Sequence, residues 1–337
     1  MNAPLRLRLD GDALVSNWRW LQRQSGSAAC GAAVKANGYG LGAKEVVTRL
    51  AAAGCRDFFV ATWAEAAEVD AHLPQDARLS VLHGVREEDM PAALASRAYP
   101  VLNTPQQVAR WKPTGRPCDV MIDTGMNRLG LAAADDLSGL QIETLMSHLA
   151  SADEDVPQNG QQLGAFQAIA ATVKARRLSL ANSAGICLGA DYQFGLTRPG
   201  LALYGGVPRA EAQGNIQPVV GVEAQILQCR RIHAGDSVGY NATFIATRTM
   251  DLAIINLGYA DGYLRGFSGR GSAAGGLYPV IGRVSMDLVA LDVTAAPVSE
   301  GDWVSMDFDL PLASAQSGLS QYELLTQLGR RFDRIWR

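Results

Sequence analysis

Lys35 is the first residue whose type and setting suggest chemistry. Only four of the 30 basic residues are lysines, and Lys35 stands in the apolar run AAVKANGYG. A lysine in an apolar strand must reach solvent, find a partner or lose its proton. An amine with a lowered pKa is a nucleophile that forms a Schiff base with an aldehyde cofactor or a ketone. From this segment alone, a strand-end lysine that reaches solvent stays open as the alternative.

Anion-binding chemistry is the second candidate. Tyr39 stands in a Gly-flanked turn, where its hydroxyl either points at a ligand or closes the loop. Ser183 follows the run LSLAN, and Gly200 follows Pro199 in RPGLALYGG. Gly-rich turns with free backbone N–H groups bind phosphate, although many such turns bind nothing. The pattern predicts an anion site at Ser183 and Gly200.

Several polar residues stand at or beyond predicted strand ends or beside glycines. Arg128 lies in DTGMNRLG and His148 in MSHLASADE, and a lone histidine is more often structural than catalytic. Tyr240 lies in VGYNATF, Tyr259 in NLGYADGY, and Met286 in RVSMD. Taken singly, these last three indicate only turns.

Elements that could position these residues alternate along the first part of the chain. Predicted strands cover 30–36, 57–62, 79–83, 99–102, 118–123, 144–149, 178–182 and 195–198. Helical spacing predicts helices at 42–54, 63–73, 87–96, 104–111 and 158–177. Eight such units favour a TIM-like (β/α)8 barrel, whose active site forms at the carboxyl ends of the strands. A doubly wound parallel sheet is the structural alternative.

The pattern changes after about residue 213. Apolar runs at 219–228, 250–257, 277–292 and 303–308 are separated by Gly, Asp and Pro, and one helix is expected near 320–329. Residues 266–276 are expected to form a flexible loop. The chain therefore divides into a barrel domain at 1–212 and a mainly β C-terminal domain at 213–337.

Composition limits the partners and the compartment. The chain has 337 residues, 48% of them hydrophobic, and a net charge of -3, which excludes a disordered chain and does not favour nucleic-acid or membrane partners. Five scattered cysteines without a CxxC pair indicate reduced thiols and no structural metal. The start MNAPLRLRLDGD is not a secretory signal, and no apolar run is long enough to span a membrane. We expect a cytoplasmic protein.

Read together, these segments resemble alanine racemases, which are fold-type III pyridoxal-phosphate enzymes. The resemblance covers nearly the whole chain and rests on motifs in family order: VKAN-YG-G around Lys35, DTGM-RLG, SH-A-ADE, ANSA, R-G-A-YG, GY-ATF, GYADGY and SMD. It implies interconversion of L-alanine and D-alanine, with D-alanine supplying a peptidoglycan precursor. It also implies a head-to-tail homodimer with composite active sites.

The resemblance assigns a role to each candidate residue. Lys35 would bind pyridoxal 5'-phosphate covalently and serve as one base, while Tyr240 of the partner subunit would act on the opposite face of the substrate. The remaining cofactor-binding residues would be Tyr39, His148, Ser183, Arg198, Gly200 and Leu201. Arg128 and the Met286 backbone would hold the substrate carboxylate. Tyr259, Arg283 and Asp287 would line the entry channel.

Three departures from the family pattern affect the pocket. Met121 replaces a lysine that is often carbamylated and positions the carboxylate-binding arginine, so Asn127 becomes a candidate for that task. Ser179 replaces a common histidine, and Arg330 falls where some members have a tyrosine. These changes bear on substrate specificity, because the replaced groups help to set the size of the pocket. The alternatives are a racemase for another amino acid such as serine and a non-catalytic pyridoxal-phosphate carrier, which would leave Tyr240 and the β domain without a use.

Overall fold

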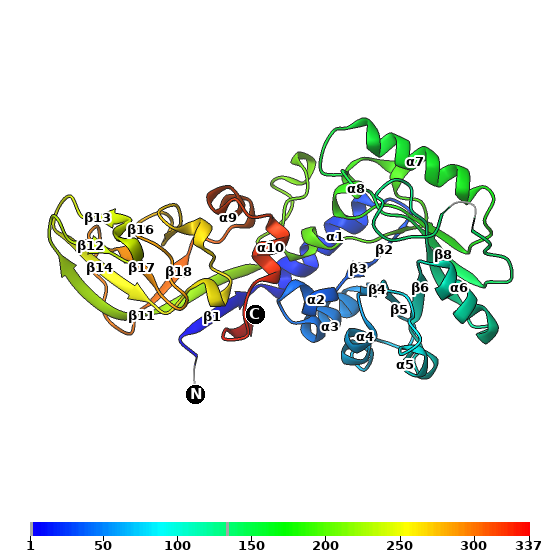
Figure 1. The fold of residues 1–337 in the computed structure, drawn as a ribbon, viewed down its shortest axis with the longest axis horizontal. Coiled ribbons are helices and arrows are strands. Elements are labelled where there is room, and N and C mark those ends of the chain that lie inside the picture. The colour runs from blue at the N-terminus through cyan, green and yellow to red at the C-terminus, as the bar shows by residue number, and fades with distance from the viewer. Residues whose placement is uncertain (1–2, 133–134) are drawn as a thin grey trace. The chain divides into compact units, whose positions relative to one another are not determined.

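The computed structural model describes residues 3–132 and 135–337 and divides the chain into two compact units (Figure 1). Leu14–Gln217 form one unit, called here the barrel unit. The segment up to Ala13 joins Pro218–Arg337 in the other, called here the β unit. No helix among the described residues is long and apolar enough to cross a membrane.

The barrel unit contains a seven-stranded parallel sheet in sequential order. Its strands are β3 (Ala32–Ala33), β4 (Asp57–Val60), β5 (Arg78–Val81), β6 (Tyr99–Leu102), β7 (Cys118–Met121), β8 (Ile142–Met146) and β9 (Arg177–Ser179). An eighth position is filled by β10 (Leu196–Thr197), which pairs in parallel with β2 (Ala29–Cys30). Backbone bonds from Gly195 N to Leu178 O (3.1 Å) and from Arg198 N to Ala181 O (2.9 Å) join β10 to the β9 side. The predicted TIM-like barrel is confirmed.

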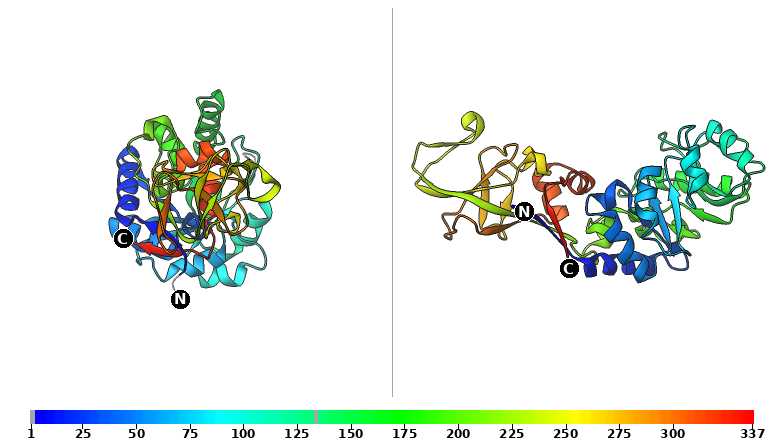
Figure 2. Two further views of the ribbon diagram at one scale, coloured as in Figure 1. Left: turned by 90° about the vertical axis from the view of Figure 1, so that its left-hand side faces the viewer. Right: turned by 90° about the horizontal axis from the view of Figure 1, so that it is seen from below.

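Helices alternate with most of the barrel strands, beginning with α1 before β2, and lie around them in the two further views of Figure 2. They are α1 (Gly11–Gln24), α2 (Lys35–Tyr39), α3 (Ala43–Ala53), α4 (Trp63–Asp70), α5 (Met90–Ala95), α6 (Pro105–Trp111), α7 (Pro157–Ala170) and α8 (Ser183–Cys187). Local sequence fixes several ends. Thr62 and Glu65 form a capping box on α4, and α3 stops at Gly54 in the left-handed conformation.

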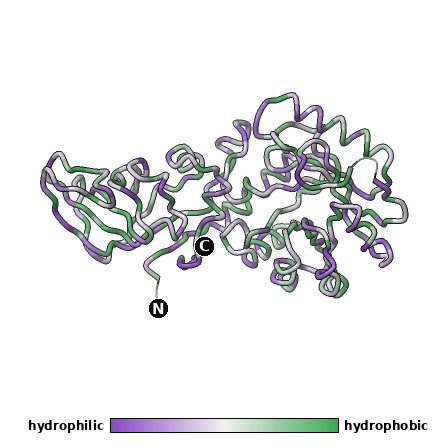
Figure 3. The backbone as a smooth tube through the Cα atoms, viewed as in Figure 1, coloured by the Kyte–Doolittle hydropathy of each residue, from purple (hydrophilic) through white to green (hydrophobic). Residues whose placement is uncertain are grey.

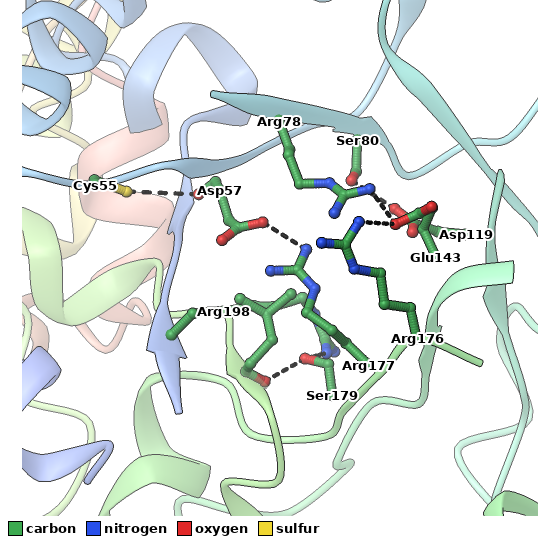
Figure 4. A network of polar contacts seen from close by, with 12 residues as sticks. Cys55, Asp57, Arg78, Ser80, Asp119, Glu143, Arg176, Arg177, Ser179 and Arg198 are labelled. Atoms are coloured by element: carbon green, nitrogen blue, oxygen red, sulfur yellow. Dashed lines mark hydrogen bonds and ion pairs between the residues drawn. The ribbon is translucent and has the colours of Figure 1, made fainter. Parts of the chain in front are cut away.

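The barrel interior is apolar on the whole but contains an ionic cluster. Hydrophobic stretches follow the strands of both units in Figure 3. Among them, Asp57, Ser80 and Asp119 are at most 6% exposed. Ser80 Oγ donates to Asp119 at 2.6 Å, and Arg177 pairs with Asp57 at 2.6 Å (Figure 4). Burial raises the pKa of Asp119 to about 6. A buried charge requires partners of this kind.

The β unit is built around the 13-residue strand β11 (Val220–Ile232). Its eight-stranded sheet runs β14-β17-β16-β15-β18-β11-β1-β19, and an added β14–β11 pairing closes six of these strands into a barrel. The other seven strands are β1 (Leu5–Leu9), β14 (Met250–Ile255), β15 (Ser272–Ala273), β16 (Tyr278–Ile281), β17 (Val289–Asp292), β18 (Trp303–Met306) and β19 (Asp333–Trp336). The smaller hairpin of β12 (Ser237–Val238) and β13 (Phe244–Ile245) and the helix α10 (Gln321–Thr326) complete the unit. The predicted mainly β character is confirmed.

The structure differs from the sequence-based expectation at three places. The strand β1 lies in the β unit, because LRLRL pairs with β11 on one side and β19 on the other. The helix α9 (Leu310–Ser317) was not predicted, and it begins where Asp309 caps the Leu312 N–H. The predicted strand 30–36 is short, since Gly31 separates β2 from β3 and Lys35 already begins a turn.

Candidate active site

Lys35 leaves β3 and opens an unusual left-handed turn. The φ angles of Ala36, Asn37, Gly38 and Tyr39 are 54°, 54°, 61° and 53°. Left-handed geometry at consecutive non-glycine residues is unfavourable, so neighbouring groups must hold it. Glu65 does so by accepting hydrogen bonds from the N–H groups of Ala36 and Ala61, both at 2.7 Å. Four constrained residues therefore fix the backbone next to Lys35.

The surroundings of Lys35 favour a neutral amine. Burial lowers the pKa of Lys35 below its ordinary value, and the positive charge of Arg128 lowers it further. The Glu65 carboxylate acts in the opposite direction and more weakly. An amine of this kind is a better nucleophile and a better base than an exposed lysine.

Tyr39, Ser183 and Gly200 meet at one corner of the barrel unit. Tyr39 stacks on Tyr204 with ring centroids 4.7 Å apart. A Cβ added at Gly200 would come within 2.2 Å of the Tyr39 hydroxyl, so a larger residue would displace this hydroxyl. Ser183 Oγ accepts hydrogen bonds from Gly200 N (2.9 Å) and Ala202 N (3.2 Å).

An unpaired donor completes this corner. Leu201 is 3% exposed and begins the short helix η3 (Leu201–Tyr204). Its N–H donates no hydrogen bond to any residue within 3–132 or 135–337. A buried N–H without a partner is unfavourable unless an anion or another acceptor takes it. The corner therefore offers two hydroxyls and a free backbone donor to an anion.

Arg198 and His148 lie beside this corner at strand ends. Arg198 is 7% exposed, and its guanidinium donates to Ser179 Oγ (Figure 4). It also donates to Ser147 O at 2.6 Å. Burial lowers the pKa of Arg198 to about 10, which still leaves it charged near neutral pH. Burial also lowers the pKa of His148 to about 3, and the charges of Arg198, Arg128 and Lys35 add to the effect. His148 is thus a neutral imidazole.

Arg128 projects from a tight turn after β7. Asp123 Oδ1 accepts the N–H groups of Gly125 (2.9 Å), Met126 (2.9 Å) and Asn127 (3.1 Å), and Asn127 has a φ of 55°. Met121, at the end of β7, is 8% exposed and carries no charge. Within the described ranges, the Arg128 guanidinium has neither an ion pair nor a hydrogen bond. The turn fixes the backbone of Arg128 and leaves its charge free for a ligand.

Gln162 is a site residue that sequence reasoning missed. It is 1% exposed on α7, and its carboxamide bonds to Thr124 Oγ1 (3.3 Å), His148 O (2.9 Å) and Ala150 N (2.8 Å). One side chain therefore joins the Arg128 turn to the segment of His148. No sequence signal marked it, because its partners are at least 12 residues away along the chain.

The remaining predicted residues lie in the β unit. Tyr240 is 63% exposed and Met286 is 53% exposed. A Cβ at Gly239 would contact Arg283 N at 3.4 Å, so Tyr240 and Arg283 belong to neighbouring segments. Tyr259 N donates to Ser285 O at 3.0 Å, which places Tyr259 beside the Met286–Asp287 segment. The structure brings these five residues into two adjoining groups within the unit.

Comparison with known proteins assigns the family. The family model for the N-terminal domain of alanine racemase matches residues 9–208, and the model for its C-terminal domain matches residues 219–336. The chain belongs to the alanine racemase family. Both expected halves of an alanine racemase are therefore present in the predicted order.

Relatives and solved structures agree with this assignment. An alanine racemase of Rhodospirillum rubrum is 42% identical and spans 97% of this chain and 94% of its own length. A biosynthetic alanine racemase of Agrobacterium fabrum is 39% identical over 98% of this chain and 93% of its own length. The crystal structure of the Bartonella henselae alanine racemase with covalently bound pyridoxal phosphate has a TM-score of 0.93 at 35% identity, and the match covers 99% of each chain.

Proposed function

We propose that this protein interconverts L-alanine and D-alanine with pyridoxal 5'-phosphate, using Lys35 and the partner subunit's Tyr240 as two bases. The observation that carries the proposal is the position of Lys35. Its amine, with a lowered pKa, belongs to the same unit as an anion corner with a free Leu201 N–H. Family membership and the cofactor named for the Bartonella henselae structure give the anion its chemical identity.

The anion corner fits a phosphate monoester. The hydroxyls of Tyr39 and Ser183 and the N–H group of Leu201 would hold it. The Gly200 backbone would line the corner, with its N–H bonded to Ser183 Oγ and its missing Cβ leaving room next to Tyr39. When bound, pyridoxal phosphate acidifies the Cα–H bond of an attached amino acid by delocalising the resulting charge. Arg198 would face the ring nitrogen and, because it keeps its own proton, would leave that nitrogen unprotonated.

Racemisation then needs one proton acceptor and one proton donor on opposite faces of Cα. Lys35 would supply its amine at one face, with a pKa lowered by burial and by Arg128. Tyr240, exposed on the β unit, would serve the other face from the partner subunit of a head-to-tail homodimer. His148 would link Arg198 to Tyr240 as a neutral hydrogen-bonding ring.

Substrate orientation would come from two donors. Arg128, whose charge has no partner in the described ranges, would hold the substrate carboxylate together with the Met286 N–H. Tyr259, Arg283 and Asp287 would line the entrance. In this assignment the barrel unit, Leu14–Gln217, binds the cofactor, and the β unit, which includes β1, completes the partner's site. The enzyme works in the cytoplasm.

A racemisation screen with purified protein tests the proposal. Alanine, serine, lysine and arginine are offered to the wild-type enzyme, to Lys35→Ala and to Tyr240→Phe. We expect alanine to be turned over fastest and the Lys35 and Tyr240 variants each to be inactive in both directions, because the forward and reverse reactions use the same two proton transfers. Preference for a basic amino acid would overturn the substrate assignment, and an unchanged Tyr240 variant would overturn the second base.

A further inference from the structure

Arg331 joins three segments of the β unit that are far apart in sequence. Its Nε donates to Asp261 Oδ1 at 2.6 Å and its second terminal nitrogen donates to Asp261 Oδ2 at 2.8 Å. The remaining nitrogen donates to Asp287 Oδ1 at 2.7 Å. One planar guanidinium therefore binds two carboxylates, the first of them with two parallel hydrogen bonds.

Asp261 depends on this arginine. Its side chain is fully buried at the end of the short helix η6 (Tyr259–Asp261). Among residues 3–132 and 135–337, Arg331 is the sole ion-pair partner of Asp261, and the Gly258 N–H adds a hydrogen bond at 3.0 Å. A buried carboxylate that loses its partner is strongly disfavoured. The clamp therefore holds η6 in place.

η6 in turn holds the backbone of Met286. The Ala260 N–H donates to Met286 O at 3.0 Å, and the Tyr259 N–H donates to Ser285 O at 3.0 Å. A Cβ at Gly258 would lie 2.2 Å from Met286 O, so the two backbones touch. The Met286 N–H itself donates to no residue within the described ranges and is thus available to a ligand.

We propose that Arg331 is a positioning residue that sets the free Met286 N–H by clamping the flanking Asp287 and the supporting Asp261. This inference rests on the proposed function, in which that N–H binds the substrate carboxylate. Asp287 then belongs to the clamp as well as to the predicted entrance. The arrangement links the C-terminal segment of the chain to substrate binding without contact between Arg331 and substrate.

The variant Arg331→Lys tests the clamp because an ammonium keeps the charge and cannot form the same fork. A displaced carboxylate donor weakens ground-state and transition-state binding alike, so KM for alanine should rise about fivefold or more while kcat changes little. Arg231→Lys is the matched control, since Arg231 forms an exposed two-bond pair with Asp251 in the same unit, at 2.7 and 3.0 Å. The control should leave both constants unchanged. Equal effects of the two variants, or a loss confined to kcat, would overturn the proposal.

Amide hydrogen exchange of the full-length holoenzyme gives a second measurement that needs no turnover. In Arg331→Lys the Tyr259 and Ala260 amides should exchange about tenfold faster, because the carbonyls that they bond to are no longer held. Asp287→Asn leaves the Asp261 contacts in place, so the exchange of these amides should accelerate less. This variant replaces Arg331→Lys in the experiment if Arg331→Lys does not fold. Unchanged exchange in both variants contradicts the clamp. An inactive wild-type enzyme with faster exchange in Arg331→Lys would instead refute the proposed function and leave the clamp standing.

Discussion

Single residues in this protein owe their chemistry to charges that lie close by. Burial lowers the pKa of Lys35 most, Arg128 lowers it further and Glu65 raises it, so the two charged neighbours act with opposite sign. Neutralising Arg128 removes a like charge, whereas neutralising Glu65 removes an opposite charge. The reactivity of Lys35 at neutral pH is therefore a balance that substitutions can move in either direction.

This balance gives a prediction for cofactor-free protein. The pH at which Lys35 is half-labelled by an amine reagent should rise in Arg128→Gln and fall in Glu65→Gln. Mass spectrometry of the Lys35 peptide measures the labelling, and the exposed Lys44 is the internal control. Shifts of the same sign in both variants would contradict the electrostatic explanation.

Gly200 carries a second prediction at the scale of one residue. In Gly200→Ala the new Cβ would come within 2.2 Å of the Tyr39 hydroxyl, which must move out of the anion corner. We expect the Kd for pyridoxal phosphate to rise about tenfold or more, as followed by an absorbance titration. The control is Gly164→Ala in α7, where a Cβ meets nothing within 4 Å and should favour the helix by up to ~1 kcal/mol. Equal affinity of the two variants would refute the role of Gly200.

At the scale of elements, α7 connects two strand ends through Gln162. In Gln162→Leu the Ala150 N–H and the Thr124 hydroxyl lose a buried partner, which should lower the free energy of unfolding by ~1–3 kcal/mol. Gln161→Leu, on the exposed side of the same helix, should stay within about 0.5 kcal/mol of wild type. Urea unfolding of both variants measures these changes in the free energy of unfolding. Equal stability of the two would show that the connection through Gln162 is dispensable.

Asp119, on β7, should make the free energy of unfolding depend on pH. Burial raises its pKa to about 6 from an ordinary 3.8, so the native state keeps a proton that the unfolded chain has released. The stabilisation from this group is complete below about pH 3.8 and is lost as the pH rises through about 6, by up to ~3 kcal/mol. The variant Asp119→Asn cannot titrate, so its stability relative to wild type should increase between pH 4 and pH 7. Urea unfolding across this range checks the sign, and a relative decrease would contradict it.

The sequence predicted elements well where periodicity is strong and local. β4 through β9 and α3 follow the predicted ranges, because continuous apolar strands alternate with amphipathic helices. β1 could not be assigned to its unit from sequence, since its partners β11 and β19 lie more than 200 residues away. α9 was not predicted because its small and polar residues leave little helical periodicity.

At the scale of the whole molecule, motif order predicted the family and both folds, and the contacts that support the motifs remained hidden. Glu65 accepts from the Ala36 N–H next to Lys35, Gln162 donates to His148 O, and Arg331 donates to Asp287. The two residues of each pair are more than 12 positions apart along the chain. No local pattern encodes such pairings. Sequence therefore indicates which side chains carry out the chemistry, whereas the structure is needed to see what orients them.

The proposed composite site leads to a prediction that mixed dimers can test. Lys35 lies in the barrel unit and Tyr240 in the β unit, and the proposal places the two bases of one site on different subunits. Lys35→Ala and Tyr240→Phe should each be inactive as homodimers. A mixed dimer would contain one intact site out of two, so the purified mixed dimer should have about half of the wild-type activity. Co-expression with two affinity tags and a racemisation assay of the doubly purified dimer measures this. If both bases came from one chain, every site would carry a substitution and no activity would return.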